Sequence, residues 1–123
     1  MPDGVQILNL ADAGGFAPAQ GVEMIPLFGE GAMLNLVRIE PDALVPVHSH
    51  PHEQIGYVVS GIEILEIAGV EHNLGPNEAY VIPGGVEHGG RGGPDGCVVI
   101  DVFVPVREDY REAAEAAARR DPS

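Results

Sequence analysis

The sequence predicts an all-β fold, a sandwich or barrel of short strands, with one helix at its C-terminal end. Short apolar runs predict the strands, and 17 glycines and 11 prolines punctuate these runs. Turn residues at such regular spacing are typical of sandwiches and barrels. The run REDYREAAEAAARR after Pro105 predicts the helix, because it is rich in strong helix formers.

The expected strands follow one another with only short turns between them. Turn-forming segments such as Phe28-Gly-Glu-Gly and Leu74-Gly-Pro-Asn separate the apolar runs. Another turn is expected at Ser60-Gly61, which divides two such runs. The strands are expected at residues 22–28, 33–39, 45–50, 55–60, 62–68, 79–82 and 97–104.

The last strand is expected to end at Pro105, which has no amide hydrogen to donate within a sheet. In the helix, at about 108–120, acidic residues precede basic ones, as the helix dipole favours. Its alanine-rich face is expected to pack on the outside of the barrel or on a partner subunit. No linker, charge block or repeat divides the chain, so residues 1–123 are expected to form one domain, with the barrel at about 20–105.

The composition argues against several classes of partner. Nineteen acidic residues against six arginines leave a formal net charge of −13, which repels nucleic acids and anionic lipids. Cys97 is the only cysteine, so no disulfide can form within the chain. The N-terminus lacks the features of a signal peptide, and no apolar run approaches the ~18 residues of a membrane span. We therefore expect a soluble cytoplasmic protein.

Three of the five histidines lie in the stretch HSHPHEQ, residues 48–54. His48 and His50 are two residues apart and share one face of a strand, where they can bind one metal ion. Pro51-His52-Glu53 is expected to form a turn that brings in Gln54 as a third ligand, and His88 is the candidate for a fourth. His52 on this turn is expected to face solvent, and His72, in a polar hairpin segment, to be exposed. A structural or solvent-exposed role for these histidines is the alternative.

The spacing of these residues resembles that of the cupins, which carry G-x5-H-x-H-x3,4-E-x6-G followed by G-x5-P-x-G-x2-H-x3-N. This chain has His48-x-His50-x3-Gln54-x6-Gly61 and then Asn77-x5-Pro83-x-Gly85-x2-His88. Gln54, Asn77 and Gly92 depart from the pattern, standing in place of Glu, Gly and Asn. The resemblance implies the cupin double-stranded β-helix, a jelly-roll barrel, with a metal inside held by His48, His50, Gln54 and His88.

The ligand types narrow the choice of metal. Imidazole nitrogens and an amide oxygen suit zinc, nickel, manganese, iron or cobalt better than calcium or magnesium. Because Gln54 is neutral, these ligands leave the charge of a divalent ion uncompensated, which makes it a stronger Lewis acid held less tightly. The iron triad with one carboxylate is absent, which disfavours oxygenase chemistry without excluding it.

A second group of candidate residues lies near the end of the barrel. Asp101 interrupts an apolar run, and strand alternation places it on one face with Cys97, Val99 and Phe103. A buried carboxylate without a partner is costly and normally takes up a proton. Arg107 follows the proline bend, where it can curl over the barrel mouth. Alternatively, Asp101 is a charge on an edge strand and Arg107 begins a solvated helix. Cys97 is expected to be a core side chain.

HSHPHEQ, IPGGVEH and DVFVPVREDY together resemble the small pectin-degradation cupins, from about residue 33 onward. Those proteins convert unsaturated monouronates from pectin or alginate into linear keto sugars. The resemblance implies a metal-dependent isomerase or lyase-like enzyme with a small acidic sugar as substrate. In it Asp101 would move protons, Arg107 would bind the uronate carboxylate and Phe103 would shape the pocket. Small cupins also suggest a homodimer, with residues 1–28 available for exchange between subunits. Alternatively, residues 22–28 close the barrel of their own chain.

Two other functions remain open. One is a metal-dependent dioxygenase with a small substrate, which oxygen consumption with iron would support. The other is a non-catalytic cupin that binds a small acid, which saturable binding of an unaltered sugar acid would support.

Overall fold

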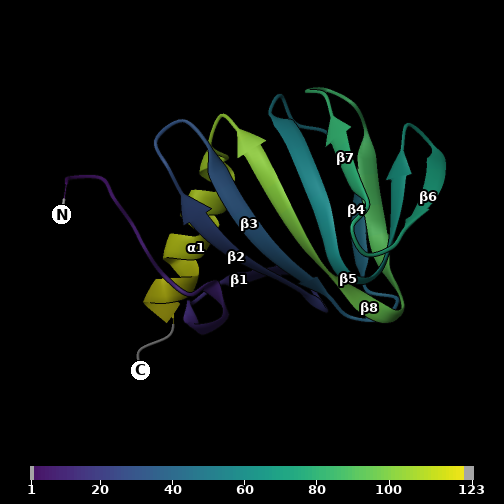
Figure 1. The fold of residues 1–123 in the computed structure, drawn as a ribbon, viewed down its shortest axis with the longest axis horizontal. Helices are drawn as coiled ribbons and strands as arrows, with labels where there is room; N and C mark the ends of the chain where they lie inside the picture. Colours follow the sequence, from purple (N-terminus) through teal and green to yellow (C-terminus); the bar gives the residue numbers. More distant parts are fainter. Residues whose placement is uncertain (1, 121–123) are drawn as a thin grey trace.

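The computed structural model describes residues 2–120, which form antiparallel β-structure and one C-terminal helix (Figure 1). A short 3-10 helix, Leu10–Asp12, precedes the strands. The strands are β1 Phe16–Ala19, β2 Val22–Phe28, β3 Met33–Ile39, β4 Leu44–His48, β5 Glu53–Ile67, β6 Val70–Leu74, β7 Ala79–Ile82 and β8 His88–Val104, and the helix is α1 Glu108–Arg120.

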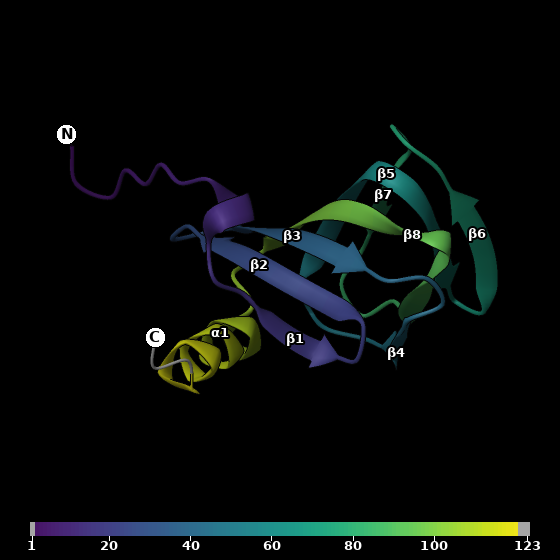
Figure 2. The same ribbon diagram turned by 90° about the horizontal axis from the view of Figure 1, so that it is seen from below.

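Two long strands, β5 and β8, hold the barrel together because each takes part in both of its sides. The pairing order is β1-β2-β3-β8-β5-β6, while β4 also pairs with β8 and β7 with β5. The beginning of β5 lies between β7 and the end of β8, and the end of β5 lies between β6 and the beginning of β8. Figure 2 shows that the strands curve around a common interior. The predicted jelly-roll fold with a C-terminal helix is confirmed.

Three predicted strands, 22–28, 33–39 and 79–82, have the predicted bounds. The turn expected at Ser60-Gly61 is wrong, because β5 continues through it with register shifts on both sides and Gly61 at φ +74. Such bulges bend a strand without ending it. The strand expected at 45–50 is Leu44–His48, and that expected at 97–104 is the second part of β8.

Strands β1 and β6 and the first half of β8 lack an apolar pattern, and the sequence did not predict them. β6 reads VEHNL and is mostly exposed, and β1 reads FAPA with one buried residue. The first half of β8 is glycine-rich, and added side chains there would collide: a Cβ on Gly92 would lie 2.3 Å from the carbonyl oxygen of Glu40. Close approach of neighbouring strands therefore replaces hydrophobic alternation in this segment.

Strand alternation correctly predicted which residues of β8 face the interior. Cys97, Val99, Asp101 and Phe103 are all buried. The opposite face of this strand lies half-buried to exposed on the outside.

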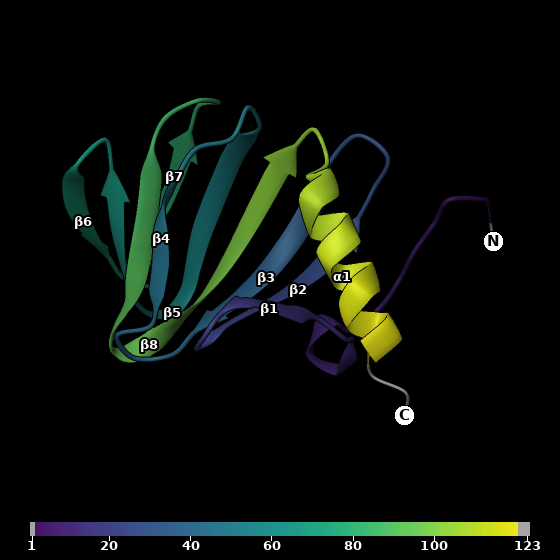
Figure 3. The same ribbon diagram turned by 180° about the vertical axis from the view of Figure 1, so that it is seen from behind.

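The helix α1 packs on its own chain, across strands β1 and β2 (Figure 3). Tyr110, Ala113, Ala114 and Ala117 lie against the core cluster that contains Phe16. Strand β2 pairs with β3 of the same chain and so closes its own barrel. No helix among residues 2–120 is long and apolar enough to cross a membrane.

Candidate metal centre

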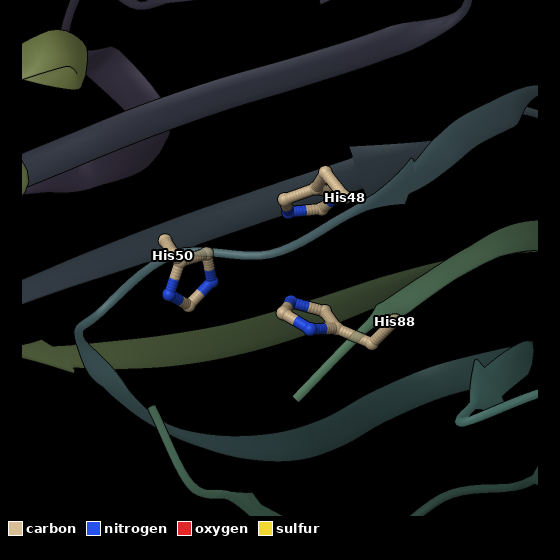
Figure 4. Close-up of side chains that lie close together, drawn as sticks. All are labelled: His48, His50 and His88. Atoms are coloured by element: carbon tan, nitrogen blue, oxygen red, sulfur yellow. The ribbon is translucent and has the colours of Figure 1, made fainter. Parts of the chain in front are cut away.

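Three histidines converge in the interior of the barrel. His48 ends β4, His50 follows it in the loop, and His88 begins β8 directly opposite His48 in the strand register. Each offers one nitrogen, and the three nitrogens lie within 4.8 Å of one another. Figure 4 shows the rings turned toward a common space.

Each imidazole is oriented by a backbone carbonyl. The Nδ1 atoms of His48 and His88 lie 2.8 Å from the oxygens of Pro46 and Val86. A neutral imidazole that donates from Nδ1 presents the lone pair of Nε2, which is the form that binds a metal ion. The Nε2 atom of His88 is buried and has no hydrogen-bond partner, as expected of a nitrogen whose partner is an ion.

The contacts of His50 also fit a cation. Its Nδ1 lies 3.1 Å from the oxygen of His52, and its Nε2 lies 3.1 Å from Oε1 of Gln54. Burial, followed by the charge of Arg107, lowers the pKa of His50 to about 4, so the ring is neutral at pH 7. A neutral imidazole has only one N–H, so one of the two oxygens faces a lone pair. A metal ion bound by both Nε2 and Oε1 removes that repulsion.

The loop between β7 and β8 brings His88 to this place. The amide of Gly85 donates to the oxygen of His50 at 2.8 Å. A Cβ on Gly84 would lie 2.2 Å from the oxygen of Pro51, so only glycine permits this approach. The two histidine segments, which are far apart in the sequence, are thereby joined by their backbones. Burial also lowers the pKa of His88, which keeps this ring neutral.

Gln54 connects the histidines to the second group of candidate residues. Its Oε1 faces His50, and its side chain lies close enough to Asp101 to lower the pKa of that carboxyl. With Oε1 directed at the histidine, the amide NH2 is the group left to face Asp101. A glutamate at this position could not donate, and it would place a second negative charge beside Asp101. This accounts for an amide where related patterns have a carboxylate.

Asp101 lies in the interior of the barrel. The alternative, a charge on an edge strand, is wrong for this residue. It accepts a hydrogen bond from Tyr80 at 2.8 Å. Burial raises the pKa of Asp101, although the hydrogen bonds from Tyr80 and Gln54 and the charge of Arg107 oppose the rise. Its carboxyl group can therefore exchange a proton at less acidic pH than an exposed aspartate.

Tyr80 and Glu63 are interior polar residues that the sequence analysis missed. Glu63 is 6% exposed, and its Oε1 has no hydrogen-bond partner. Burial and the negative charge of Asp101 raise the pKa of Glu63. Alternation could not single it out, because in IEILEI each face of the strand carries one glutamate.

Arg107 is buried at the end of the barrel, where it is bound on two sides. Its Nε and Nη2 donate to the carboxylate of Asp109, and its Nη1 donates to the hydroxyl of Tyr110 at 2.8 Å. The guanidinium also stacks on the ring of Tyr110, 3.7 Å from its centroid, and lies 5.2 Å from that of Phe103. The alternative, a solvated start of the helix, is wrong for this arginine.

Residues of both groups line one interior cavity, which shares His48, Arg107 and Tyr110 with an open groove. His48, Gln54, His88, Asp101 and Phe103 line the cavity together with Arg107. The groove, lined by His48, Arg107 and Tyr110, has a volume of about 340 Å³ and is larger than the cavity. A sugar-sized molecule in this groove can contact His48 and Arg107 at once.

The remaining predicted histidines lie away from the centre. His72 is exposed, as predicted. His52 is half-buried instead of solvent-facing, its ring lies 5.4 Å from that of His50, and its Nδ1 has no partner. Cys97 is a buried core residue, and burial raises its pKa to about 12, so it remains a thiol.

Comparison with known proteins agrees with this architecture. Residues 35–103 match the family described as the cupin domain. The pectin degradation protein KdgF of Dickeya dadantii is 31% identical over 84 residues, which cover 68% of this chain and 76% of that protein. The structure of KdgF from Halomonas sp. is similar with a TM-score of 0.79 and 28% identity, over 85% of this chain and 97% of that one.

An RmlC-like cupin from Shewanella frigidimarina has the same TM-score of 0.79 and 28% identity, over 86% of this chain and 96% of that one. The family match covers more than half of the chain and includes the interior histidines, Asp101 and Phe103. The chain therefore belongs to the cupin domain family, as a KdgF-like member.

Proposed function

We propose that this cupin is a metal-dependent enzyme that opens the ring of 4,5-unsaturated monouronates from pectin or alginate, and that residues 1–123 act as one domain. The observation that carries the proposal is the convergence of three histidines beside a cavity that a proton-exchanging carboxyl, Asp101, and a buried arginine also line. A divalent metal held by His48, His50, Gln54 and His88 would supply Lewis acidity toward an oxygen of the sugar.

The positive charge of Arg107 complements the negative charge of the proposed substrate. A uronate is an anion, and the chain carries a net charge of −13, so a local cation is required to hold it. Arg107 borders both the cavity and the groove. Arginine binds carboxylates with two parallel hydrogen bonds, which orient the sugar as well as retain it.

Asp101 can supply the proton transfers of such a reaction. When the ring opens, the anomeric hydroxyl loses a proton, the C1–O5 bond breaks, and O5 becomes the oxygen of an enol. The enol becomes a ketone when its hydroxyl loses a proton and C4 gains one. No proton is consumed overall, so one carboxyl that accepts and returns protons suffices. Phe103 would form an apolar wall that keeps the sugar in place.

The direct test is turnover of an unsaturated monouronate, followed by loss of absorbance of the conjugated double bond. We expect turnover under argon, its loss after chelation, and its recovery with zinc, nickel or manganese. Oxygen consumption that depends on iron would favour the dioxygenase instead. Saturable binding of the uronate with no conversion would favour the non-catalytic function.

A homodimer accords with the outer face of the sheet. Ile55, Tyr57 and Val81 are 43%, 42% and 59% exposed, and Ile55 pairs directly with Val81. An apolar sheet face of this kind is suited to packing against a second copy. We expect Val81→Glu to convert a dimer into a monomer in light scattering, whereas a wild-type monomer at micromolar concentration would contradict the proposal.

A further inference from the structure

The interior contains a tyrosine to which the proposed reaction assigns no task. Tyr80, on β7, lines the cavity together with Asp101 and two of the histidines. Burial, followed by the negative charge of Asp101, raises the pKa of Tyr80, so its hydroxyl keeps its proton. This hydroxyl donates to Oδ1 of Asp101 at 2.8 Å. The tyrosine therefore holds one oxygen of the residue that the proposed reaction uses for proton transfer.

A glycine on the intervening strand permits this contact. In the strand register Gly56 pairs with Tyr80 on one side and with Asp101 on the other, so the three positions lie on the same face of the sheet. A Cβ on Gly56 would lie 2.1 Å from Cζ of the Tyr80 ring. A larger residue at position 56 would displace the ring, so the hydroxyl reaches Asp101 because this position has no side chain.

The side chain on the other flank of Asp101 does not bond it. Asn35, on β3, pairs with Asp101 in the strand register and is fully buried. Neither the nitrogen nor the oxygen of its amide has a hydrogen-bond partner. Of the two side chains that flank Asp101 across the sheet, the tyrosine is therefore the one that can orient its carboxyl group.

We propose that Tyr80 is a positioning residue for Asp101, which fixes the rotation of its carboxyl group, and that Gly56 supplies the space for this contact. The terminal torsion of an aspartate is broad, so a carboxyl group without a partner takes several orientations. With Oδ1 held by the hydroxyl, Oδ2 is left to act on the substrate from one position. The inference rests on the proposed function, because it concerns the reaction at Asp101.

The first test is Tyr80→Phe, which removes the hydroxyl and keeps the ring. A misplacement of about 1 Å near the reacting atoms can lower a rate by on the order of 100-fold. We expect kcat for an unsaturated uronate to fall about tenfold, with KM, bound metal and the unfolding temperature nearly unchanged. A kcat within twofold of the wild type, or a loss of metal that matches the loss of rate, would overturn the proposal.

Gly56→Ala tests the same contact from the neighbouring strand and separates positioning from packing. We expect it to lower both kcat and the unfolding temperature, because the added methyl group collides with the tyrosine ring. In the Tyr80→Phe background the same change should again lower the unfolding temperature, since the ring remains. It should lower kcat less than twofold there, since the hydroxyl is already absent. Rates that follow stability through all three variants would indicate a merely structural role and overturn the proposal.

Two variants serve as matched controls. Tyr57→Phe removes an exposed tyrosine hydroxyl that bonds Asn77. Asn35→Leu changes the other flank of Asp101 to an apolar side chain of similar size and removes no hydrogen bond to the carboxyl. Both should leave kcat within about twofold of the wild type. A loss of rate in Asn35→Leu as large as that in Tyr80→Phe would mean that general packing around Asp101 matters, and not the hydroxyl.

Crystal structures of the wild type and of Tyr80→Phe separate failure of this inference from failure of the proposed function. We expect the Asp101 carboxyl group to have one orientation in the wild type and to turn, or to take two orientations, in the variant. The same single orientation in both would overturn the positioning role, whether or not the wild type converts uronates. A turned carboxyl group in a protein whose wild type converts no uronate would support the positioning role and reject the proposed substrate.

Discussion

Arg107 and Asp109 form a bidentate ion pair, with Nη2–Oδ2 at 2.7 Å and Nε–Oδ1 at 3.2 Å. The arginine side chain is 8% exposed, whereas that of the aspartate is 58% exposed. Burial by itself would raise the pKa of Asp109, but the hydrogen bonds and charge of Arg107 lower it. Asp109 thus holds one edge of the guanidinium and Tyr110 holds one Nη1 hydrogen, so one hydrogen on Nη1 and one on Nη2 are left for another carboxylate.

Loss of the guanidinium should therefore affect acidic substrates selectively. We expect Arg107→Ala to raise KM for an unsaturated uronate far more than for its neutral methyl ester. Because this arginine is buried and its removal can harm folding, Tyr110→Phe gives a milder test. Loss of one hydrogen bond, worth ~0.5–1.5 kcal/mol, should raise KM for the uronate several-fold with kcat unchanged. Equal effects on acid and ester would contradict a carboxylate-binding role.

Asp101→Asn should separate proton transfer from metal binding. The amide preserves the shape of the side chain and can still contact Tyr80 and Gln54, but it cannot exchange a proton. We expect turnover to fall by about a hundredfold or more while the metal content remains that of the wild type. Elemental analysis and steady-state kinetics on the same sample measure both quantities. Loss of the metal in this variant would mean that Asp101 supports the metal centre instead.

Gln54→Glu should strengthen metal binding and weaken catalysis. A carboxylate in place of the amide adds a negative charge to the ligands, but it removes the donor to Asp101 and further raises the pKa of that residue. We expect a lower dissociation constant for zinc in a competition with a chelator, together with a kcat profile whose acidic limb moves to higher pH. Gln20→Glu, a change at an exposed position, is the control for added charge. Unchanged zinc affinity would argue against Gln54 as a ligand.

Glu63→Gln should stabilise the protein at neutral and alkaline pH. The pKa of Glu63 is raised above its ordinary 4.5, so the folded state binds more protons than the unfolded state between these two values. The stability of the wild type should therefore fall as the pH rises from about 4.5 through the folded pKa, at ~1.4 kcal/mol for each unit of the shift.

The neutral amide removes this loss, so thermal unfolding at pH 8 should occur several degrees higher in the variant than in the wild type. At pH 4, where Glu63 carries a proton in both states, the difference should nearly vanish. A variant that melts below the wild type at both pH values would show that Glu63 contributes hydrogen bonds worth more than its desolvation costs.

The sequence by itself determined the features that depend on neighbouring residues along one strand. Alternation in 97–104 predicted which side chains are inside, including Asp101, and the two-residue spacing of His48 and His50 predicted that they point the same way. These inferences succeeded because the two-residue period of a β-strand is local, so one buried side chain fixes the orientation of its neighbours. The glycine and proline spacing likewise indicated the barrel, and the run of helix formers after Pro105 indicated the final helix.

Only the tertiary structure decided which distant side chains meet. Bulges carry β5 through Ser60-Gly61, and the register that results places Gly56 between Tyr80 and Asp101 and turns Glu63 inward. No local pattern encodes that register, because it depends on hydrogen bonds between strands that are remote in the sequence. The partners of Arg107 were equally hidden, since a buried guanidinium requires the packing of α1 against the barrel.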